Sequence, residues 1–162
     1  MKTCIVYYSM SGNSEYAAGL AAKILDADLI KLEPVKAYPD SGFRKFYVGG
    51  RSAVLGERPP LKPYVFDGEK YDRVIFCFPV WAGRPAPPIK TFAIENREIL
   101  REKKIAVLAT FGGAGADKAI DKLMDFLDIY ELEAELVLVE PKDRPDPENE
   151  EEIEDFCAEL EK

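Results

Sequence analysis

The 162 residues are 47% apolar and 32% charged, which describes a soluble globular protein of about one domain. No apolar run approaches the roughly 20 residues that a membrane-spanning helix needs, so a membrane protein is excluded. The formal net charge of −8 repels nucleic acid and anionic membranes and favours a basic protein partner. The chain has no histidine, the commonest general base and metal ligand. We therefore expect no metal site, and we expect a bound cofactor to supply any chemistry.

The cysteines and the first residues indicate a compartment. Cys4, Cys77 and Cys157 are odd in number and lack metal-ligand spacing, which favours reduced thiols in the cytoplasm. The opening residues, MKTCIVYYS, pass directly into a strand-like run without a separate apolar segment, so we expect no secretory signal.

Strand-like and helix-like patterns alternate along the chain. Short apolar runs rich in β-branched and aromatic residues predict five strands, at 2–8, 27–33, 71–78, 103–111 and 134–140. Helical spacing of apolar residues predicts one helix after the first strand and others at 89–100, 116–127 and 148–160. The buried stripe expected on the first helix consists of Ala17, Leu20, Ala21 and Ile24.

The connection over residues 34–68 is the longest between two strands. One helical stripe is expected in it, made of Phe43, Phe46, Tyr47, Gly50 and Val54. The prolines of the following ERPPLKPY forbid helix, so that part should run extended over the surface. We therefore predict a single domain over 1–162, with an acidic C-terminal helix in 145–162.

Strands that alternate with helices predict a mainly parallel sheet with right-handed crossovers. The predicted fold class is α/β, a doubly wound three-layer sandwich. In such sheets ligands bind beyond the carboxyl ends of the strands, near the point where the strand order reverses. This rule selects the loops that follow the first, third and fourth strands.

The first loop, SMSGNS, consists of small hydroxyl residues, an asparagine and a glycine ahead of a helix. A helix N-terminus presents unpaired N–H groups and the positive end of the helix dipole, so it binds anions without a cationic side chain. A plain N-cap is the alternative, but a cap needs only one such residue. We favour phosphate binding over simple capping.

Other phosphate sites do not match the spacing. No lysine follows Gly12, as the Walker loop requires, and the dinucleotide fingerprint G-x-G-x-x-G is absent after the first strand. Cys77 and Arg84 lie one residue too far apart for the C-x5-R turn of low-molecular-weight tyrosine phosphatases, and on the wrong strand.

The second loop, PVWAGRPAPP, contains the only tryptophan, and the third, TFGGAGA, is rich in glycine. A tryptophan in such a loop can be a hinge over the core or a flat surface for a bound ring, and we favour the ring. The glycines of the third loop expose backbone polar groups, which alone is a weak signal.

These motifs resemble those of the flavodoxin family. SMSGNS matches the [ST]-x-[ST]-G-N-[ST] phosphate loop of that family at each defined position, and PVWAGRPAPPIKTF is similar to a segment of one short-chain branch. The resemblance spans roughly residues 1–140. It implies a five-stranded sheet in the order 2-1-3-4-5 and a non-covalently bound FMN.

By position, the resemblance implies three groups of cofactor-binding residues. The phosphate group would lie against Ser9, Met10, Ser11, Gly12, Asn13 and Ser14. The isoalloxazine ring would lie between two sets, Pro79, Val80, Trp81, Ala82 and Gly83 on one side and Thr110, Phe111, Gly112 and Gly113 on the other. Neutral donors would hold the phosphate dianion with no cation nearby.

Two functions fit this resemblance. The first is an electron carrier between redox proteins, favoured by the small domain, the acidic charge and the lack of a catalytic base. The second is a small NAD(P)H oxidoreductase that reduces quinones, flavins or nitro compounds. It is favoured because the third loop offers Phe111 where known flavodoxins stack a tyrosine, and because Arg84 could steer a substrate. A non-redox role, as an FMN-dependent regulator or assembly factor, is a third possibility. We favour the carrier.

Overall fold

The computed structural model describes the backbone of residues 1–39 and 42–162, and the side chains of all of these except 42–47. The stripe predicted for Phe43, Phe46 and Tyr47 therefore lies outside the described side chains. The strands are β1 (Thr3–Tyr7), β2 (Asp28–Lys31), β3 (Arg73–Trp81), β4 (Arg84–Pro85), β5 (Lys104–Phe111) and β6 (Ala134–Val139). The helices are α1 (Asn13–Leu25), α2 (Gly42–Val54), α3 (Pro87–Glu95), α4 (Arg97–Leu100), α5 (Ala116–Leu127) and α6 (Pro147–Leu160), with a 3₁₀ turn, η1, at Gly68–Lys70.

Five of the strands form one parallel sheet in the order β2-β1-β3-β5-β6. With the hairpin strand β4 left out of the count, this is the predicted order 2-1-3-4-5. Tyr7 pairs with Cys77, and Pro79 with Thr110. The carboxyl ends of β1, β3 and β5 therefore meet at one edge, and the strand order reverses beside β1.

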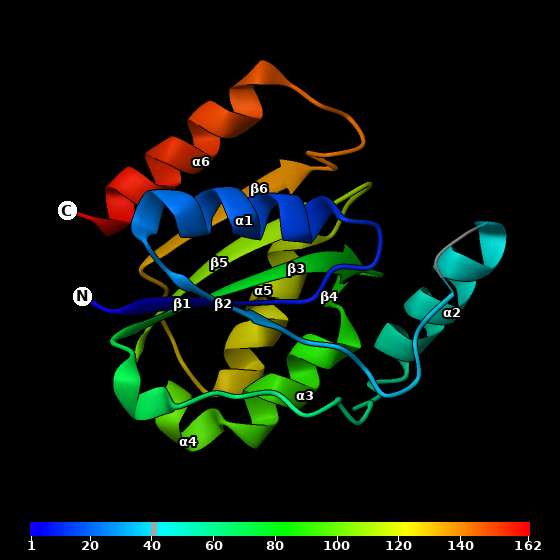
Figure 1. Cartoon of the computed structure of the whole chain (residues 1–162). Helices are drawn as coiled ribbons and strands as arrows, with labels where there is room; N and C mark the ends of the chain where they lie inside the picture. The colour runs from blue at the N-terminus through cyan, green and yellow to red at the C-terminus, as the bar shows by residue number, and fades with distance from the viewer. Residues whose placement is uncertain (40–41) are drawn as a thin grey trace.

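Helices cover both faces of the sheet, as a doubly wound sandwich requires (Figure 1). α1 and α6 lie on one face, and α3, α4 and α5 lie on the other (Figure 1). α2 stands away from both layers, beyond the carboxyl edge of the sheet (Figure 1). No helix in the described part of the chain has the length and apolar character that crossing a membrane demands.

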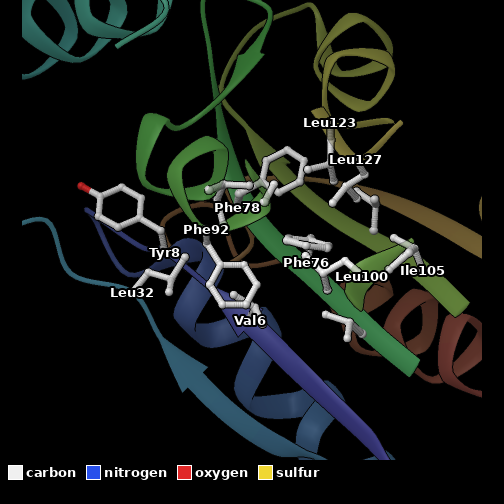
Figure 2. Packing of buried hydrophobic residues seen from close by; sticks show 14 of the residues in the cluster. Val6, Tyr8, Leu32, Phe76, Phe78, Phe92, Leu100, Ile105, Leu123 and Leu127 are labelled. Carbon is white, nitrogen blue, oxygen red and sulfur yellow. The ribbon is translucent and has the colours of Figure 1, made fainter. Parts of the chain in front are cut away.

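Large side chains fill the core on the α3–α5 side (Figure 2). Phe76, Phe78 and Phe92 are fully buried there, and the ring centroids of Phe76 and Phe92 lie 6.0 Å apart at 66°. Burying aromatic side chains of this size is a main source of folding free energy. This core holds the central strands, and with them the strand ends, in fixed positions.

On the opposite face α1 contributes small side chains to the core, and here the predicted helix stripe is partly wrong. Ala17 and Ala21 are buried as expected, but Ala18 and Ala22 complete the buried face of α1, while Ile24 is 48% exposed. The cause is that α1 packs against both the sheet and α6, so it turns its small alanines inward.

The structure also corrects two predicted boundaries. The predicted helix 89–100 is two helices, because the Asn96 Nδ2 donates to Phe92 O (3.0 Å) and to the Tyr64 hydroxyl (2.9 Å) at the break. Asparagine competes in this way with the helical backbone bonds. The third strand runs on to Trp81, three residues beyond the predicted end.

The connection between β2 and β3 contains α2 and an extended crossing, as predicted. The crossing is attached to α3 by two hydrogen bonds, from the Thr91 hydroxyl to Pro59 O (2.9 Å) and from the Lys90 ammonium to Gly56 O (2.9 Å). Pro34, at the start of the connection, and Leu61, within the extended crossing, form an isolated antiparallel bridge. These contacts fix where α2 leaves and rejoins the body of the protein.

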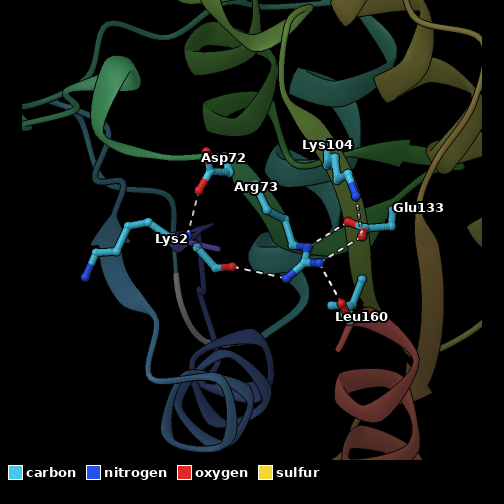
Figure 3. A network of polar contacts seen from close by, with 7 residues as sticks. Lys2, Asp72, Arg73, Lys104, Glu133 and Leu160 are labelled. Atoms are coloured by element: carbon cyan, nitrogen blue, oxygen red, sulfur yellow. Dashed lines mark hydrogen bonds and ion pairs between the residues drawn. The ribbon is translucent and has the colours of Figure 1, made fainter. Parts of the chain in front are cut away.

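A buried ion pair holds the opposite, amino edge of the sheet (Figure 3). Arg73 is 2% exposed, and its guanidinium donates to both Glu133 oxygens at 2.7 and 2.8 Å. It also donates to Leu160 O at the end of α6 (2.6 Å) and to the Thr3 hydroxyl (3.2 Å). The hydrogen bonds from Arg73 hold the pKa of the Glu133 carboxyl below its usual value.

We predict that Glu133→Gln lowers the free energy of unfolding at pH 7 by about 3 kcal/mol, because it leaves a buried guanidinium without its counter-charge. Urea unfolding at pH 7 and pH 3 measures this. The folded-state pKa of Glu133 is lowered, so its contribution is fully present above the unfolded pKa of about 4.3 and is lost as the pH falls through the folded pKa. The difference in free energy of unfolding between the unchanged protein and Glu133→Gln should therefore shrink at pH 3.

Glu135→Gln is the matched control, because Glu135 is an exposed residue of β6 only two positions after Glu133. It should unfold like the unchanged protein at both pH values. Equal stability of the Glu133→Gln variant and this control at pH 7 would contradict the prediction.

Candidate functional site

A pocket of about 440 Å³ lies beyond the carboxyl ends of β1, β3 and β5. This volume is in the lower part of the range, roughly 300–1,000 Å³, that is usual for small-molecule sites. The lining residues are Ser9, Met10, Ser11, Asn13, Ser14, Gly50, Pro79, Val80, Trp81, Ala82, Thr110, Phe111, Gly112, Gly113, Ala114 and Glu140. The structure thus brings the three predicted loops together around one cavity.

All the predicted site residues line this pocket except Gly12 and Gly83. These two glycines instead shape the turns that form its walls. Three further residues, Gly50, Ala114 and Glu140, line the pocket and were missed from the sequence. Glu140 follows the last strand of the parallel sheet, so its position at the same edge was a signal that could have been used.

A left-handed residue turns the first loop into α1. Gly12 has φ 96°, and its carbonyl accepts the first helical bond from the Tyr16 N–H (3.0 Å). Its own N–H donates back to the Ser9 hydroxyl oxygen (3.1 Å). This conformation is open to glycine at little cost, and it directs the following N–H groups toward the pocket end of the helix.

Several backbone N–H groups of the loop remain available for an anion. The first turn of a helix has no internal acceptors, and Gly12 at the N-cap provides no side-chain cap. Between Ser9 and Glu15, all of which the structure describes, the N–H groups without an acceptor are those of Ser9, Met10, Ser11, Asn13, Ser14 and Glu15. Together with the positive end of the α1 dipole, they form a site suited to a phosphate.

Two side chains that the sequence marks as phosphate donors are engaged within the protein. The Asn13 carbonyl oxygen accepts from the N–H groups of Lys142 (2.9 Å) and Asp143 (3.1 Å), and its amide donates to the Asp143 carboxylate (3.0 Å). The Ser14 hydroxyl is buried and shares a 2.9 Å hydrogen bond with the Thr110 hydroxyl. These side chains fix the loop in place, while the backbone carries the open donors.

A cation lies at this loop, contrary to the sequence-based expectation. The Lys142 ammonium donates to Ser11 O (3.2 Å), and the lysine stem passes over Gly12. A Cβ on Gly12 would come within 2.8 Å of the Lys142 Nζ. Spacing along the first loop could not reveal this lysine, because it is contributed by the segment after β6.

The second predicted loop is a tight hairpin. Val80 pairs with Pro85 and Trp81 with Arg84, in antiparallel register. Ala82 (φ 50°) and Gly83 (φ 72°) form the two-residue turn between them. Two successive residues with positive φ are the mark of the type I′ turn, which suits the twist of paired strands.

Trp81 packs on the core and also lines the pocket. Its ring meets Tyr8 edge-on at 5.7 Å and Tyr38 edge-on at 5.1 Å. Gly49 of α2 lies against the six-membered ring, since a Cβ there would come within 3.2 Å of the Trp81 Cε3. The position of this ring therefore depends on α2.

Hydrogen bonds tie the aromatic cluster to α2. The hydroxyls of Tyr38 and Ser52 are 2.9 Å apart, and the Ser52 hydroxyl donates to the Glu57 carboxylate at 2.7 Å. Tyr8 is 5% exposed, and burial raises the pKa of its phenol. Its ring therefore serves as uncharged packing beneath Trp81.

The third loop completes the pocket and meets the segment after β6. The Glu140 carboxylate lies beside Gly112, where a Cβ would come within 2.6 Å of the Glu140 Oε1. Arg144 pairs with Glu140 at 2.8 Å. Among the described lining residues, Glu140 alone carries an acidic or basic side chain.

Cys77 provides no nucleophile for this site. The thiol is fully buried and donates to Ser14 O (3.2 Å) beneath the first loop. Burial raises the pKa of this thiol, so it remains protonated at neutral pH. The structure thus agrees with the exclusion of a phosphatase from the sequence.

Comparisons with known proteins agree with one another on the fold. A family model described as Flavodoxin matches residues 2–140. A flavoprotein from Lactobacillus acidophilus NCFM, solved in complex with FMN, shares 22% identity over 88% of this chain and 95% of its own, with a TM-score of 0.71. A candidate flavoprotein from Bacteroides uniformis ATCC 8492 shares 21% over 97% of each chain, with a TM-score of 0.75.

A third structure is the two-electron reduced flavodoxin of Megasphaera elsdenii, with 14% identity over 96% of this chain and 98% of its own and a TM-score of 0.57. At such identities the structural likeness shows a common fold. A search of curated proteins finds no match to the chain. The family model is therefore the evidence that identifies the chain.

We predict that Gly12→Ala lowers the free energy of unfolding by about 1–2 kcal/mol, because an alanine at φ 96° is strained. The contact with the Lys142 stem adds to this loss. Chemical denaturation measures the effect. Gly19→Ala, inside α1 with open space around it, should instead raise the stability by about 0.5–1 kcal/mol. If Gly12→Ala and Gly19→Ala changed the free energy of unfolding equally, the left-handed conformation assigned to Gly12 would be contradicted.

A second pair of variants tests the contact between α2 and Trp81. Both Gly49→Ala and Gly50→Ala gain helix propensity, worth about 0.5–1 kcal/mol. Only Gly49→Ala presses on the indole ring, so it should lose this gain and shift the fluorescence emission. The chain has a single tryptophan, so emission reports on Trp81 alone. If neither variant changes the emission, α2 does not position the ring.

Proposed function

The chain belongs to the flavodoxin family, and we propose that it uses FMN, the cofactor of that family, to carry electrons between redox proteins. FMN is also the cofactor that the sequence predicts. The family model covers the three strand-end loops that form the pocket, which supports FMN as its ligand. Support for the carrier role comes from the side chains that line this pocket.

The residues present fit both ends of FMN. At one end, the open N–H groups and the Ser11 hydroxyl suit a phosphate, and a left-handed glycine lets the backbone approach closely. At the other end, Met10, Trp81 and Phe111 provide apolar and aromatic surface for a flat ring system. Gly50 and Gly113 leave open space, where a Cβ would meet no atom within 4 Å.

Bound FMN supplies transfer of one or two electrons, and the protein supplies binding, orientation and electrostatics. The open N–H groups of the first loop would hold the phosphate, and the hairpin and the third loop would orient the ring between them. The buried hydroxyl pair of Ser14 and Thr110 keeps the two loops at a constant spacing.

The single observation that carries the proposal is that the described residues lining the pocket offer no free carboxylate, histidine or lysine for acid–base catalysis. Glu140, the one charged side chain among the described lining residues, is paired with Arg144. A proton donor placed at the reacting atoms speeds the reduction of an organic substrate, whereas transfer of electrons alone has no use for one. A carrier therefore fits this pocket better than an enzyme.

The oxidoreductase alternative has less support. The Arg84 guanidinium, which could steer a nicotinamide, donates to Ala82 O (3.0 Å) within its own hairpin. The pocket volume also suits a single ligand of moderate size. The net charge of −8 favours a basic redox protein as the partner, through long-range steering.

We predict that the purified protein binds FMN with a one-to-one stoichiometry. In an anaerobic redox titration it should show two resolved one-electron potentials, because a carrier must pass electrons singly between proteins. Absorbance spectroscopy at controlled potential measures this. With NAD(P)H and a quinone but no partner protein, the steady rate should be close to that of free FMN.

Each contrary result has its own meaning. Turnover of NAD(P)H well above the rate of free FMN would favour the oxidoreductase. Failure to take up FMN would contradict the assignment of the pocket itself. A refolded sample with an unchanged circular dichroism spectrum serves as the control for correct folding.

A further inference from the structure

We propose that Lys142, from the segment after β6, supplies a positive charge to the phosphate of FMN and makes the site selective for the phosphorylated flavin. This inference rests on the proposed FMN site and concerns its phosphate end. The motif of the first loop is complete without a cation, so nothing in that motif assigns this role to a lysine.

The position of Lys142 is fixed on the main chain. Its backbone N–H donates to the Asn13 side-chain oxygen at 2.9 Å, and the next N–H, of Asp143, donates to the same atom at 3.1 Å. Asn13 is 7% exposed and begins α1. The segment after β6 is therefore attached to the first turn of the helix that would receive the phosphate.

The side chain of Lys142 then lies along the same loop. A Cβ on Gly12 would meet the lysine Cδ at 3.0 Å and Cε at 3.3 Å, so the stem covers the backbone of the turn. The ammonium ends at Ser11 O, at 3.2 Å. Ser11 lines the pocket, and its own N–H is among the open donors.

The charge of this ammonium is not neutralised by a carboxylate in the described part of the chain. Of the two carboxylates nearest in sequence, Asp143 accepts from the Asn13 amide and Glu140 is paired with Arg144. The Lys142 ammonium donates to a neutral carbonyl, Ser11 O. Its positive charge is thus available to an anion held by the neighbouring N–H groups.

A phosphate monoester carries a charge of about −1.5 to −2 at pH 7. A cation within a few ångströms stabilises it even near the surface, although salt screens the interaction. Riboflavin has the same ring system but no phosphate. The lysine should therefore affect the affinity for FMN and leave that for riboflavin unchanged.

The test compares FMN and riboflavin affinities of Lys142→Met, Lys142→Arg and the unchanged protein, by fluorescence titration of the full chain. Lys142→Met should weaken FMN binding by about fivefold at low ionic strength, with unchanged riboflavin affinity. Lys142→Arg should retain most of the FMN affinity. At about 1 M salt, where the Debye length is about 3 Å, the difference should largely vanish.

Lys118→Met is the matched control. It removes an equal charge from an exposed lysine beside Gly83, at the hairpin end of the site. It should leave the ratio of FMN to riboflavin affinity unchanged.

The outcomes separate this inference from the proposed function. If FMN binds and Lys142→Met leaves the affinity ratio unchanged, or lowers both affinities equally, the role of Lys142 is overturned while the FMN site stands. If the unchanged protein binds neither flavin, the proposed site itself fails, and this inference fails with it.

Discussion

The attachment of the α1 N-terminus to its neighbours is the constraint on which the rest of the site depends. Ser14 is linked to two central strands, to β5 through the Thr110 hydroxyl and to β3 through the Cys77 thiol. Asn13 is linked to the segment after β6 by three hydrogen bonds. Because these side chains hold the turn, its open backbone N–H groups keep their direction without an acceptor of their own. The side chains of Asn13 and Ser14, which the sequence marks as phosphate donors, thus act mainly to hold the backbone N–H groups that would bind the phosphate.

Much of the fold could be predicted from the sequence because it depends on local patterns. The alternation of apolar runs with helical stripes predicts the parallel sheet, and the residues after three strand ends predict the pocket. α5 occupies the predicted range, 116–127, because both its ends are marked by glycine or by a break in the pattern. Such local patterns predict an element without information on which distant segments pack against it.

What could not be predicted depends on contacts between distant segments. The break at Asn96 needs the Tyr64 hydroxyl, which is 32 residues away. The buried face of α1 depends on α6, and the cation at the first loop comes from Lys142, 131 residues from its acceptor. Trp81 belongs to a strand because a two-residue turn brings Arg84 back beside it. In each case the local pattern was compatible with more than one structure, and tertiary contacts decided between them.

The two ends of the pocket are built in different ways, and this difference bears on redox function. The phosphate end is held by buried hydrogen bonds to the central sheet, so its geometry should vary little. The ring end rests on Trp81, whose position depends on Gly49 of α2, an element that stands outside the two helix layers (Figure 1). A shift of α2 would therefore change the surface offered to the ring without disturbing the phosphate. The family phosphate loop accounts for retention of the cofactor. The surroundings of a flavin ring tune its electronics. The reduction potential of the flavin in this chain would therefore be set by α2 and its aromatic cluster.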